Sequence, residues 1–544
     1  MTRVFLFVGF FLLAASEGKA QKRYEIILRQ GTVYDGNGGE PFVSDIAINA
    51  DTIAAIGNLS NSTGTTEMII KGLAIAPGFI NMLSWADGTL LEDSRAMSDI
   101  KQGVTTEVFG EGISPGPRKR SAKSKLWKTL GGYFNHLEKK GVSPNFASFV
   151  GATSIRSYVV GLDNRKPTAV ELTEMKALVR QAMEEGAMGV GSSLIYAPAT
   201  FANTEELIEL CKIAGNYGGM YITHMRSESD KVLEATNETI TISKEAKLPA
   251  EIYHIKINQQ RNWSKIDALL YKIDSAQKAG VRISANIYPY AASATGLKER
   301  IPTMYQEGGI VKLRERILNP EIRKKMLSDM SLGIPTRNSD PRDVMILGFK
   351  KDSLNTLYKG KRLDEIAFLH GKSTDETVLD LLTADQSSIG AVYFLISEAN
   401  MNRMLRQPYV SIGSDAGAPA LTKNFTDSGT HPRAYGTFAR VLAKYVRDEK
   451  VLTLPEAIRR MTTLPAAHLK IKKRGSLTKG NFADIVVFDP EKVQDYATYE
   501  NPHQYSTGVQ HVFVNGIQVL KDGEHTGATP GRCVRGPGYK ISSR

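Results

Sequence analysis

Three short segments of the chain carry residue types that can bind a metal ion or move a proton. They are residues 221–228 (YITHMRSE), 253–256 (YHIK) and 411–417 (SIGSDAG). Each segment places one such side chain, His224, His254 or Asp415, at the end of a short β-branched or aromatic run, where a strand should end and a loop begin. In a barrel of parallel strands, the chemistry is found at these strand ends.

A single histidine after a strand is more often a hydrogen-bonded core residue than a ligand. Here His224 and His254 lie about thirty residues apart, which is the length of one βα unit, and Asp415 follows another predicted strand. Two histidines on successive strands with a downstream carboxylate therefore predict a metal site with an acid or base beside it. The alternative for Asp415 is an aspartate that caps the following GlyAla turn.

The middle of the chain alternates predicted strands with amphipathic helices. A helix is expected over 171–185, and strands are expected around 188–192, 220–224 and 282–288. Both ends are instead β-rich: residues 24–73 alternate in short runs with turn signals, and strands are expected at 483–488 and 511–519, the second broken by an AsnGly hairpin turn. The predicted fold class is α/β, a TIM-type (β/α)8 barrel with a small β-sandwich domain built from both chain ends.

The predicted domains follow from this pattern. They are a signal peptide at 1–20, sandwich segments at 21–75 and 471–544, and the barrel at 76–470, with an insertion at about 297–363. The insertion is rich in charge and poor in strand signals, so we expect it beside the active-site face, where it could act as a lid.

Residues 1–20 differ from the rest of the chain. Arg3 precedes an apolar run that is short for a bilayer span, and the small residues of GlyLysAla at 18–20 suit cleavage before Gln21. We expect a cleaved signal and an exported protein, periplasmic or secreted, with no later stretch able to form a membrane helix. Cys211 and Cys533 could pair in an oxidising compartment, but a structural disulfide is not required.

The 544-residue chain has 42% hydrophobic residues, so it can bury a normal core. Its formal net charge of +12 falls to +11 without residues 1–20. The excess is spread along the chain, and no nucleic-acid-binding module accompanies it. Nucleic acid is therefore not expected as a partner, whereas an anionic small molecule is.

Several further motifs follow residue 20. They are APGFI at 76–80, GVTT at 103–106, GSSLIYAP at 191–198, THMR at 223–226, HIK at 254–256, YPY at 288–290, SD at 414–415, HPRAYGTFARVL at 431–442 and ADIVVFDP at 483–490. Taken together these motifs are specific: with them the chain resembles the N-acyl-D-amino-acid deacylases, or D-aminoacylases, of the amidohydrolase superfamily, over nearly everything after residue 20.

Two departures from the family pattern concern metal ligands. The family usually follows ProGlyPheIle with AspXxxHisXxxHis, but residues 81–85 are NMLSW, so Leu83 and Trp85 stand in the histidine places. Neither side chain can ligate a hard or borderline metal cation. The family also tends to carry a cysteine after GlyValThrThr, within GlyAsnCysGly, where this chain has GEG at 110–112 with Glu111 as the nearest possible ligand.

The resemblance implies a site in which Glu111, His224 and His254 hold one Zn²⁺ per chain, with an open fourth position for water. In the family, the metal held by the cysteine and the two later histidines is the essential one, so loss of the HisXxxHis pair need not abolish catalysis. Asp415 is then the proton-transferring carboxylate. If Glu111 is instead a paired or capping carboxylate, Asp87 and Glu107 are the next ligand candidates.

The implied substrate carries a free α-carboxylate, for which an arginine fork is the best geometric match. By their positions in the family motifs, Arg433, Lys256 and Tyr288 are the expected binding residues, with Tyr290 as the alternative to Tyr288. Tyr196 is expected to line the acyl side. Each of these side chains could instead have no role in binding: the arginine and lysine could be surface residues, and the tyrosines could belong to the core.

The implied function is metal-dependent hydrolysis of the amide bond of N-acyl-D-amino acids, which releases a carboxylic acid and a D-amino acid. Two alternatives remain at this point. One is a dipeptidase that acts on peptides with a C-terminal D-residue, and the other is a metal-free binding homologue that kept the fold. Retention of His224, His254 and Asp415 favours an enzyme, whereas loss of the HisXxxHis pair favours the binding protein.

Overall fold

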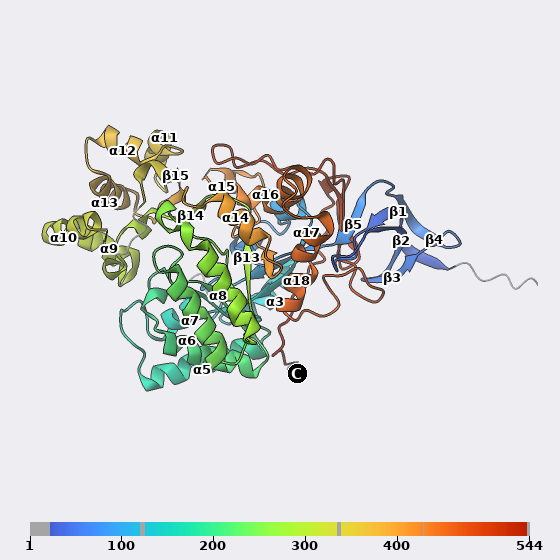
Figure 1. The fold of residues 1–544 in the computed structure, drawn as a ribbon, viewed down its shortest axis with the longest axis horizontal. Coiled ribbons are helices and arrows are strands. Elements are labelled where there is room, and N and C mark those ends of the chain that lie inside the picture. The colour runs from blue at the N-terminus through green and yellow to red at the C-terminus, as the bar shows by residue number, and fades with distance from the viewer. Residues whose placement is uncertain (1–21, 120–125, 334–338, 428, 541–544) are drawn as a thin grey trace, which may run out of the picture.

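The computed structural model describes residues 22–119, 126–333, 339–427 and 429–540, so the expected signal peptide lies outside the described residues. The ribbon has three regions (Figure 1). Parallel strands and their helices fill the middle, helices α9–α13 form a lobe at the upper left, and β1–β4 lie at the opposite end. The structure is α/β, as predicted.

The central strands are parallel and are linked edge to edge by hydrogen bonds. They are β6 (Phe79–Asn81), β7 (Val104–Phe109), β8 (Asn145–Ser148) with its continuation β9 (Val150–Gly151), β10 (Gly189–Ser193), β11 (Met220–His224), β12 (Ala250–Ile252), β13 (Ile283–Ile287) and β17 (Val410–Ile412). The last strand returns to the first, because Ser84 and Ala416 form a parallel bridge and the Asp415 amide donates to the Leu83 carbonyl at 2.9 Å. All their carboxyl ends therefore face the same side.

Helices separate successive strands along the chain. They include α3 (Leu130–Lys140), α4 (Ala152–Val159), α5 (Ala169–Glu184), α6 (Thr204–Asn216), α7 (Val232–Glu245) and α8 (Ile266–Lys278). Helices α5–α8 lie side by side in front of the central strands (Figure 1). Helix α5 matches the predicted helix and begins with a capping box between Thr168 and Glu171, which satisfies two backbone N–H groups at its start. Asn203 caps α6 through the Glu206 amide.

The two chain ends share one nine-stranded sheet. It contains β1 (Arg23–Val33), β2 (Phe42–Asn49), β3 (Thr52–Gly57), β4 (Thr63–Ile69), β5 (Ala74–Pro77), β18 (Ile485–Phe488), β19 (Val509–Val514), β20 (Ile517–Lys521) and β21 (Glu524–His525). β5 and β18 join the two ends as an antiparallel pair. The predicted AsnGly turn is confirmed: Asn515 and Gly516 connect β19 to β20 with positive φ angles of 49° and 78°, as a tight hairpin turn requires.

A lobe with a hydrophobic core of its own spans Leu297 to Leu395 and includes the predicted insertion at about 297–363. Its elements are β14 (Ser293–Gly296), α9 (Gly309–Leu318), α10 (Pro320–Ser331), β15 (Val344–Gly348), α11 (Asp352–Tyr358), α12 (Leu363–His370), α13 (Thr374–Asp385) and β16 (Gly390–Tyr393). The three strands form a small antiparallel sheet, in which β16 lies between β14 and β15.

The remaining helices connect these regions. They are α1 (Ala86–Glu92), α2 (Met97–Ile100), α14 (Glu398–Leu405), α15 (Lys423–Thr426), α16 (Arg433–Arg440), α17 (Leu454–Met461) and α18 (Thr463–His468). No helix within the described ranges has the length and apolarity needed to cross a bilayer. Cys211 is buried and Cys533 is half-buried, and both are free thiols.

A buried polar cluster lies beneath the strand ends of β6 and β7. The Asn81 amide Nδ2 donates to Asp99 Oδ2 at 2.9 Å, to Glu107 Oε2 at 3.2 Å and to Ser414 Oγ at 2.8 Å. Burial raises the pKa of Glu107 to about 6, and burial together with the Glu107 charge raises the pKa of Asp99 well above its ordinary value. The two carboxyl groups therefore retain a proton in the folded state at pH values where an exposed carboxyl group has lost it.

This cluster should make stability depend on pH. Because the folded-state pKa values are raised, the contribution is full below the unfolded pKa of about 4 and is lost as pH rises through about 6 and beyond. Asp99→Asn removes one of the two titrating carboxyl groups. As pH rises from 5 to 8, the free energy of unfolding of this variant should therefore decrease by less than that of the parent, and the difference between the two decreases should be on the order of 2 kcal/mol.

The measurement is urea unfolding across that pH range, with Glu92→Gln on the exposed surface of α1 as the control. The control should keep the parent's slope of stability against pH. Parallel curves for Asp99→Asn and the parent would show that the carboxyl pair does not hold an extra proton.

Candidate active site

A cavity of about 450 Å³ opens at the carboxyl ends of the central strands. The lobe contributes to its wall through β14 and Leu347, so the cavity is bounded by the strand ends on one side and by the insertion on the other. Its lining includes Trp85, Glu111, Ile113, Tyr196, His224, His254, Lys256, Tyr288, Ser293, Thr295, Leu347, Asp415, His431 and Arg433. All the residues expected to bind metal or substrate, and the expected base, thus meet in one cavity.

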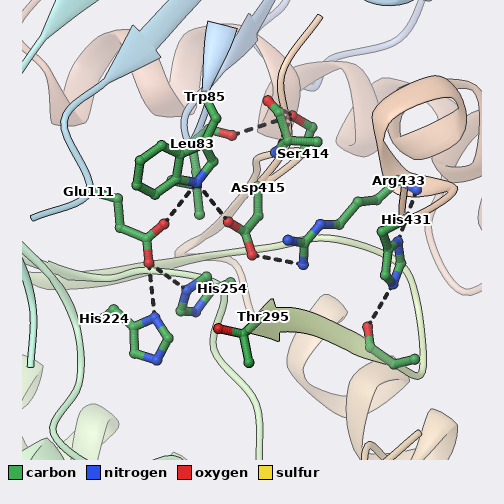
Figure 2. Close-up of polar contacts among 12 residues, drawn as sticks. Leu83, Trp85, Glu111, His224, His254, Thr295, Ser414, Asp415, His431 and Arg433 are labelled. Atoms are coloured by element: carbon green, nitrogen blue, oxygen red, sulfur yellow. Dashed lines mark hydrogen bonds and ion pairs between the residues drawn. The ribbon is translucent and has the colours of Figure 1, made fainter. Parts of the chain in front are cut away.

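Three candidate metal ligands converge at its floor (Figure 2). His224 ends β11, His254 lies two residues after β12, and Glu111 follows β7. Glu111 Oε1 lies 2.9 Å from His224 Nδ1 and 2.9 Å from His254 Nε2. Gly110, before Glu111, has a φ of 105°, and a Cβ there would lie 2.5 Å from the Phe149 carbonyl, so only glycine allows the turn that brings Glu111 to the histidines.

The three residues fit a divalent metal ion. One ligand atom from each lies within 4.8 Å of the others, and all three side chains are buried. Burial raises the pKa of Glu111, but the charges and hydrogen bonds of His254 and His224 outweigh it and hold the pKa well below its ordinary value. A carboxylate and two imidazoles are donors that a zinc-like cation accepts, and the carboxylate supplies the charge that neutral imidazoles lack.

Glu228 supports these ligands and was not among the predicted site residues. Its Oε1 lies 3.1 Å from His254 Nδ1 and 2.6 Å from Lys256 Nζ, and the Asn258 amide donates to its other oxygen at 3.2 Å. A carboxylate behind a ligating histidine fixes the orientation of the imidazole ring. The signal in the sequence was its position four residues after His224, in the same segment.

The pKa of His254 is set by the charged groups around it. Burial and the neighbouring Lys256 ammonium lower the pKa of His254, but the carboxylates of Glu111 and Glu228 outweigh both and raise it to about 9. The same negative charge stabilises a metal cation, so a proton and a metal compete for the site.

Lys256 is the expected substrate-binding lysine and lines the cavity. Its ammonium group also donates to Glu228 at 2.6 Å and to the His254 backbone carbonyl at 2.8 Å, so the structure places it in the cavity wall as part of the support of His254. The side chain is 3% exposed, and its charge compensates the buried Glu228 carboxylate.

Asp415, the expected base, lies beside Glu111, on the other side of the Trp85 indole N–H (Figure 2). It lies just beyond β17 with a φ of 51°, and its Oδ2 forms an ion pair with Arg433 at 2.8 Å. Burial raises the pKa of Asp415, Arg433 opposes this effect, and the Glu111 charge adds to it, so the pKa remains above its ordinary value. A raised pKa makes the carboxylate a stronger base.

The remaining expected binding residues form the far wall of the cavity. The Arg433 guanidinium lies over the Tyr288 ring at 4.7 Å, and the Tyr196 hydroxyl accepts a hydrogen bond from Thr295 of the lobe at 3.0 Å. Tyr288 lines the cavity, whereas Tyr290 packs behind it against His431 and Tyr499. Thr295 was not predicted, because no local signal in the sequence links β14 to the strand ends.

Leu83 and Trp85, which stand in the usual histidine places, differ in their surroundings. Leu83 is fully buried in a hydrophobic cluster. The Trp85 indole N–H instead points into the cavity and donates to Glu111 Oε2 and to Asp415 Oδ1, both at 3.1 Å (Figure 2). The alternative ligand Glu107 belongs to the buried cluster with Asn81, and Asp87 lies on α1.

Comparisons with known proteins agree with this geometry. A sequence profile of the amidohydrolase family matches residues 358–520. The D-aminoacylase of Alcaligenes xylosoxydans xylosoxydans is 33% identical over 523 residues, which cover 94% of this chain and 97% of that protein.

Two solved structures are similar over 94% of this chain and 100% of their own. The first belongs to a study of the binuclear metal centre of D-aminoacylase, described there as one-metal activation and second-metal attenuation, with a TM-score of 0.78 and 32% identity. The second is the N-acyl-D-glutamate deacylase of Bordetella bronchiseptica, complexed with zinc and a phosphonate inhibitor that mimics the tetrahedral intermediate, with a TM-score of 0.79 and 28% identity.

The fold and the site thus define the protein as an amidohydrolase. Within that class the chain belongs to the D-aminoacylase family of N-acyl-D-amino-acid deacylases, because its similarity to those enzymes extends over nearly its whole length. The resemblance inferred from the motifs is confirmed.

The role of Glu111 can be tested through metal affinity. Glu111→Gln keeps the side-chain volume but removes the negative charge, so it should weaken zinc binding by at least 10-fold, because two neutral imidazoles leave the charge of Zn²⁺ unbalanced. Glu111→Cys restores an anionic ligand and should bind zinc better than Glu111→Gln. The measurement is competition with a chromogenic chelator.

Glu234→Gln, on the exposed surface of α7, is the matched control and should bind zinc like the parent. Parental affinity in Glu111→Gln would make Glu111 a structural carboxylate.

Proposed function

We propose that this protein hydrolyses the amide bond of N-acyl-D-amino acids and releases a carboxylic acid and a D-amino acid. The observation that carries the proposal is the buried Glu111, His224 and His254 set with Asp415 and its Arg433 partner in the same cavity. The curated relatives named D-aminoacylase, N-acyl-D-aspartate deacylase and N-acyl-D-glutamate deacylase support the substrate class.

Different residues of the chain have different roles in this hydrolysis. A zinc ion bound by Glu111, His224 and His254 would polarise the scissile carbonyl group and make water more acidic. Asp415 accepts a proton from the attacking water and delivers it to the leaving nitrogen as the C–N bond breaks. Its elevated pKa suits both the acceptance and the return of that proton.

The α-carboxylate of the substrate is bound by the cationic and hydroxyl groups of the far wall. Arg433 is the principal donor, because its planar guanidinium matches a carboxylate and lies over the Tyr288 ring. The Tyr196 and Thr295 pair lines the same cavity on the side proposed for the acyl group. An ion pair between Arg433 and Asp415 thus joins substrate binding to the position of the base.

We further propose one zinc ion per chain. The zinc-bound deacylase structure supports the identity of the metal. The presence of Leu83 and Trp85 where the family carries two histidines supports the number, because neither side chain is a ligand.

The ring of parallel strands with outer helices supports the proposal of a (β/α)8 barrel, with its site at the carboxyl ends of the strands. The shared terminal sheet supports a β-sandwich built from both chain ends. Arg3 and the apolar run after it support export to the periplasm or medium.

One observation favours a second candidate, a dipeptidase that acts before a C-terminal D-residue. A further hollow of about 530 Å³ shares Trp85, Glu111, Ile113 and Tyr196 with the main cavity. It offers room beyond the scissile bond for an acyl group larger than acetyl, including an amino-acyl group. A metal-free binding protein is disfavoured, because the three ligand side chains remain convergent.

The substrate class and the metal can be tested together. Protein purified without added metal should contain close to one equivalent of zinc by mass spectrometry. In a screen of N-acetyl and N-succinyl D- and L-amino acids and of dipeptides, it should release D-amino acids. A preference for L-substrates, or two zinc ions both needed for turnover, would contradict the proposal.

Two substitutions should separate the base from the metal ligands. Asp415→Asn should retain zinc and lower kcat by roughly 1,000-fold, because it removes the proton-transferring group. His224→Ala should instead lose the metal. Zinc content and steady-state kinetics measure both effects, and near-parental turnover in Asp415→Asn would assign the base elsewhere.

A further inference from the structure

The Trp85 side chain lies between the two carboxylates that matter most for catalysis. Its single N–H group is 3.1 Å from Glu111 Oε2 and 3.1 Å from Asp415 Oδ1, so one donor is shared by a candidate metal ligand and the candidate base (Figure 2). An indole N–H can only donate and does not ionise, so in both contacts Trp85 is the donor and the carboxylate oxygen is the acceptor. The arrangement therefore favours both groups as carboxylates.

The backbone around Trp85 holds the indole in this place. The Trp85 amide donates to the Ala416 carbonyl at 2.9 Å, and the preceding residue, Ser84, forms the parallel bridge to Ala416. Asp415 lies on the same connection, since its amide donates to the Leu83 carbonyl at 2.9 Å. The indole and the carboxylate that it contacts are thus fixed to each other through neighbouring strand ends.

The Asp415 carboxylate is held at both oxygens. Arg433 pairs with Oδ2 at 2.8 Å, and the Trp85 N–H binds Oδ1 at 3.1 Å. The hydrogen bond from Trp85 thereby prevents rotation of the carboxylate about its last bond and fixes it toward the cavity. A base that is held in one orientation transfers a proton with less reorganisation.

The indole also fills the space between Glu111 and Asp415. Those two carboxylates, with one more ligand from position 85, would be the natural donors for a second cation. A neutral N–H donor in that space satisfies both oxygens and offers no lone pair to a metal.

We propose that Trp85 is a positioning residue that orients Asp415 and Glu111 and excludes a second metal ion. The inference rests on the proposed deacylase function for its catalytic part, whereas the exclusion of a second metal concerns binding alone. It predicts that the parent enzyme binds one zinc ion and keeps its activity when zinc is in excess.

The test of positioning uses Trp85→Phe, which keeps an aromatic ring but removes the N–H. It should retain one zinc ion and a KM within about threefold of the parent, while kcat falls about 10- to 100-fold, as for other groups that orient metal-site residues. Trp263→Phe is the matched control, because the Trp263 N–H donates to the Leu395 carbonyl, with no contact to Glu111 or Asp415 among its described contacts. It should leave kcat unchanged.

The test of exclusion uses Trp85→His, which supplies a third ligand beside Glu111 and Asp415. This variant should bind a second equivalent of zinc in equilibrium dialysis and lose activity as zinc is added, whereas the parent and Trp263→Phe should do neither. Thermal unfolding of each variant checks that it is folded.

The experiments on Trp85 can fail independently of the proposed deacylase function. A parent that binds one zinc ion but releases no D-amino acid would overturn the function, while dialysis would still decide the exclusion of a second metal. Unchanged kcat in Trp85→Phe, or loss of its zinc, would overturn positioning. Two zinc ions in the parent, or only one in Trp85→His, would overturn exclusion.

Discussion

The structure of the site depends on the burial of several carboxylates in one cavity. Glu111 and Glu228 are nearly excluded from water and the Asp415 side chain is only 11% exposed, and an unpaired buried charge is strongly unfavourable. The surrounding side chains supply the compensation: two imidazoles beside Glu111, Lys256 beside Glu228, and Arg433 beside Asp415. A cation bound by Glu111, His224 and His254 would add to this compensation.

This balance constrains how a substrate can bind. An N-acyl amino acid brings another carboxylate into a cavity that already contains several, so its binding requires a cation whose charge is not fully satisfied by the protein. Under the proposed function Arg433 would meet this need, because its fork presents several N–H donors and one oxygen of Asp415 is paired with it at 2.8 Å. The ring of Tyr288 beneath the guanidinium keeps the fork in the cavity.

The lobe and the buried cluster of Asn81, Asp99, Glu107 and Ser414 act at a distance from the reacting atoms. The lobe closes one wall through β14, where Thr295 contacts Tyr196. The cluster ties Ser414, which precedes the proposed base Asp415, to the end of β6, since the Ser414 amide also donates to Asn81 Oδ1 at 2.9 Å. The position of Asp415 is therefore set by the strands beneath it as well as by Arg433 and Trp85.

Local sequence patterns predict the alternation of strands and helices, the terminal β segments, and the positions of His224, His254 and Asp415 at strand ends. These follow from local periodicity and turn chemistry, which need no knowledge of distant contacts. Four other features depend on contacts between distant parts of the chain. Glu228 supports His254, Thr295 reaches Tyr196, and the lobe continues past residue 363. Trp85 faces two carboxylates, whereas Leu83 enters the core. Trp85 and Asp415 are separated by 330 residues, and nothing in either local sequence specifies that their strands are neighbours. Such contacts depend on how the ring of strands closes, which is a property of the packed chain as a whole.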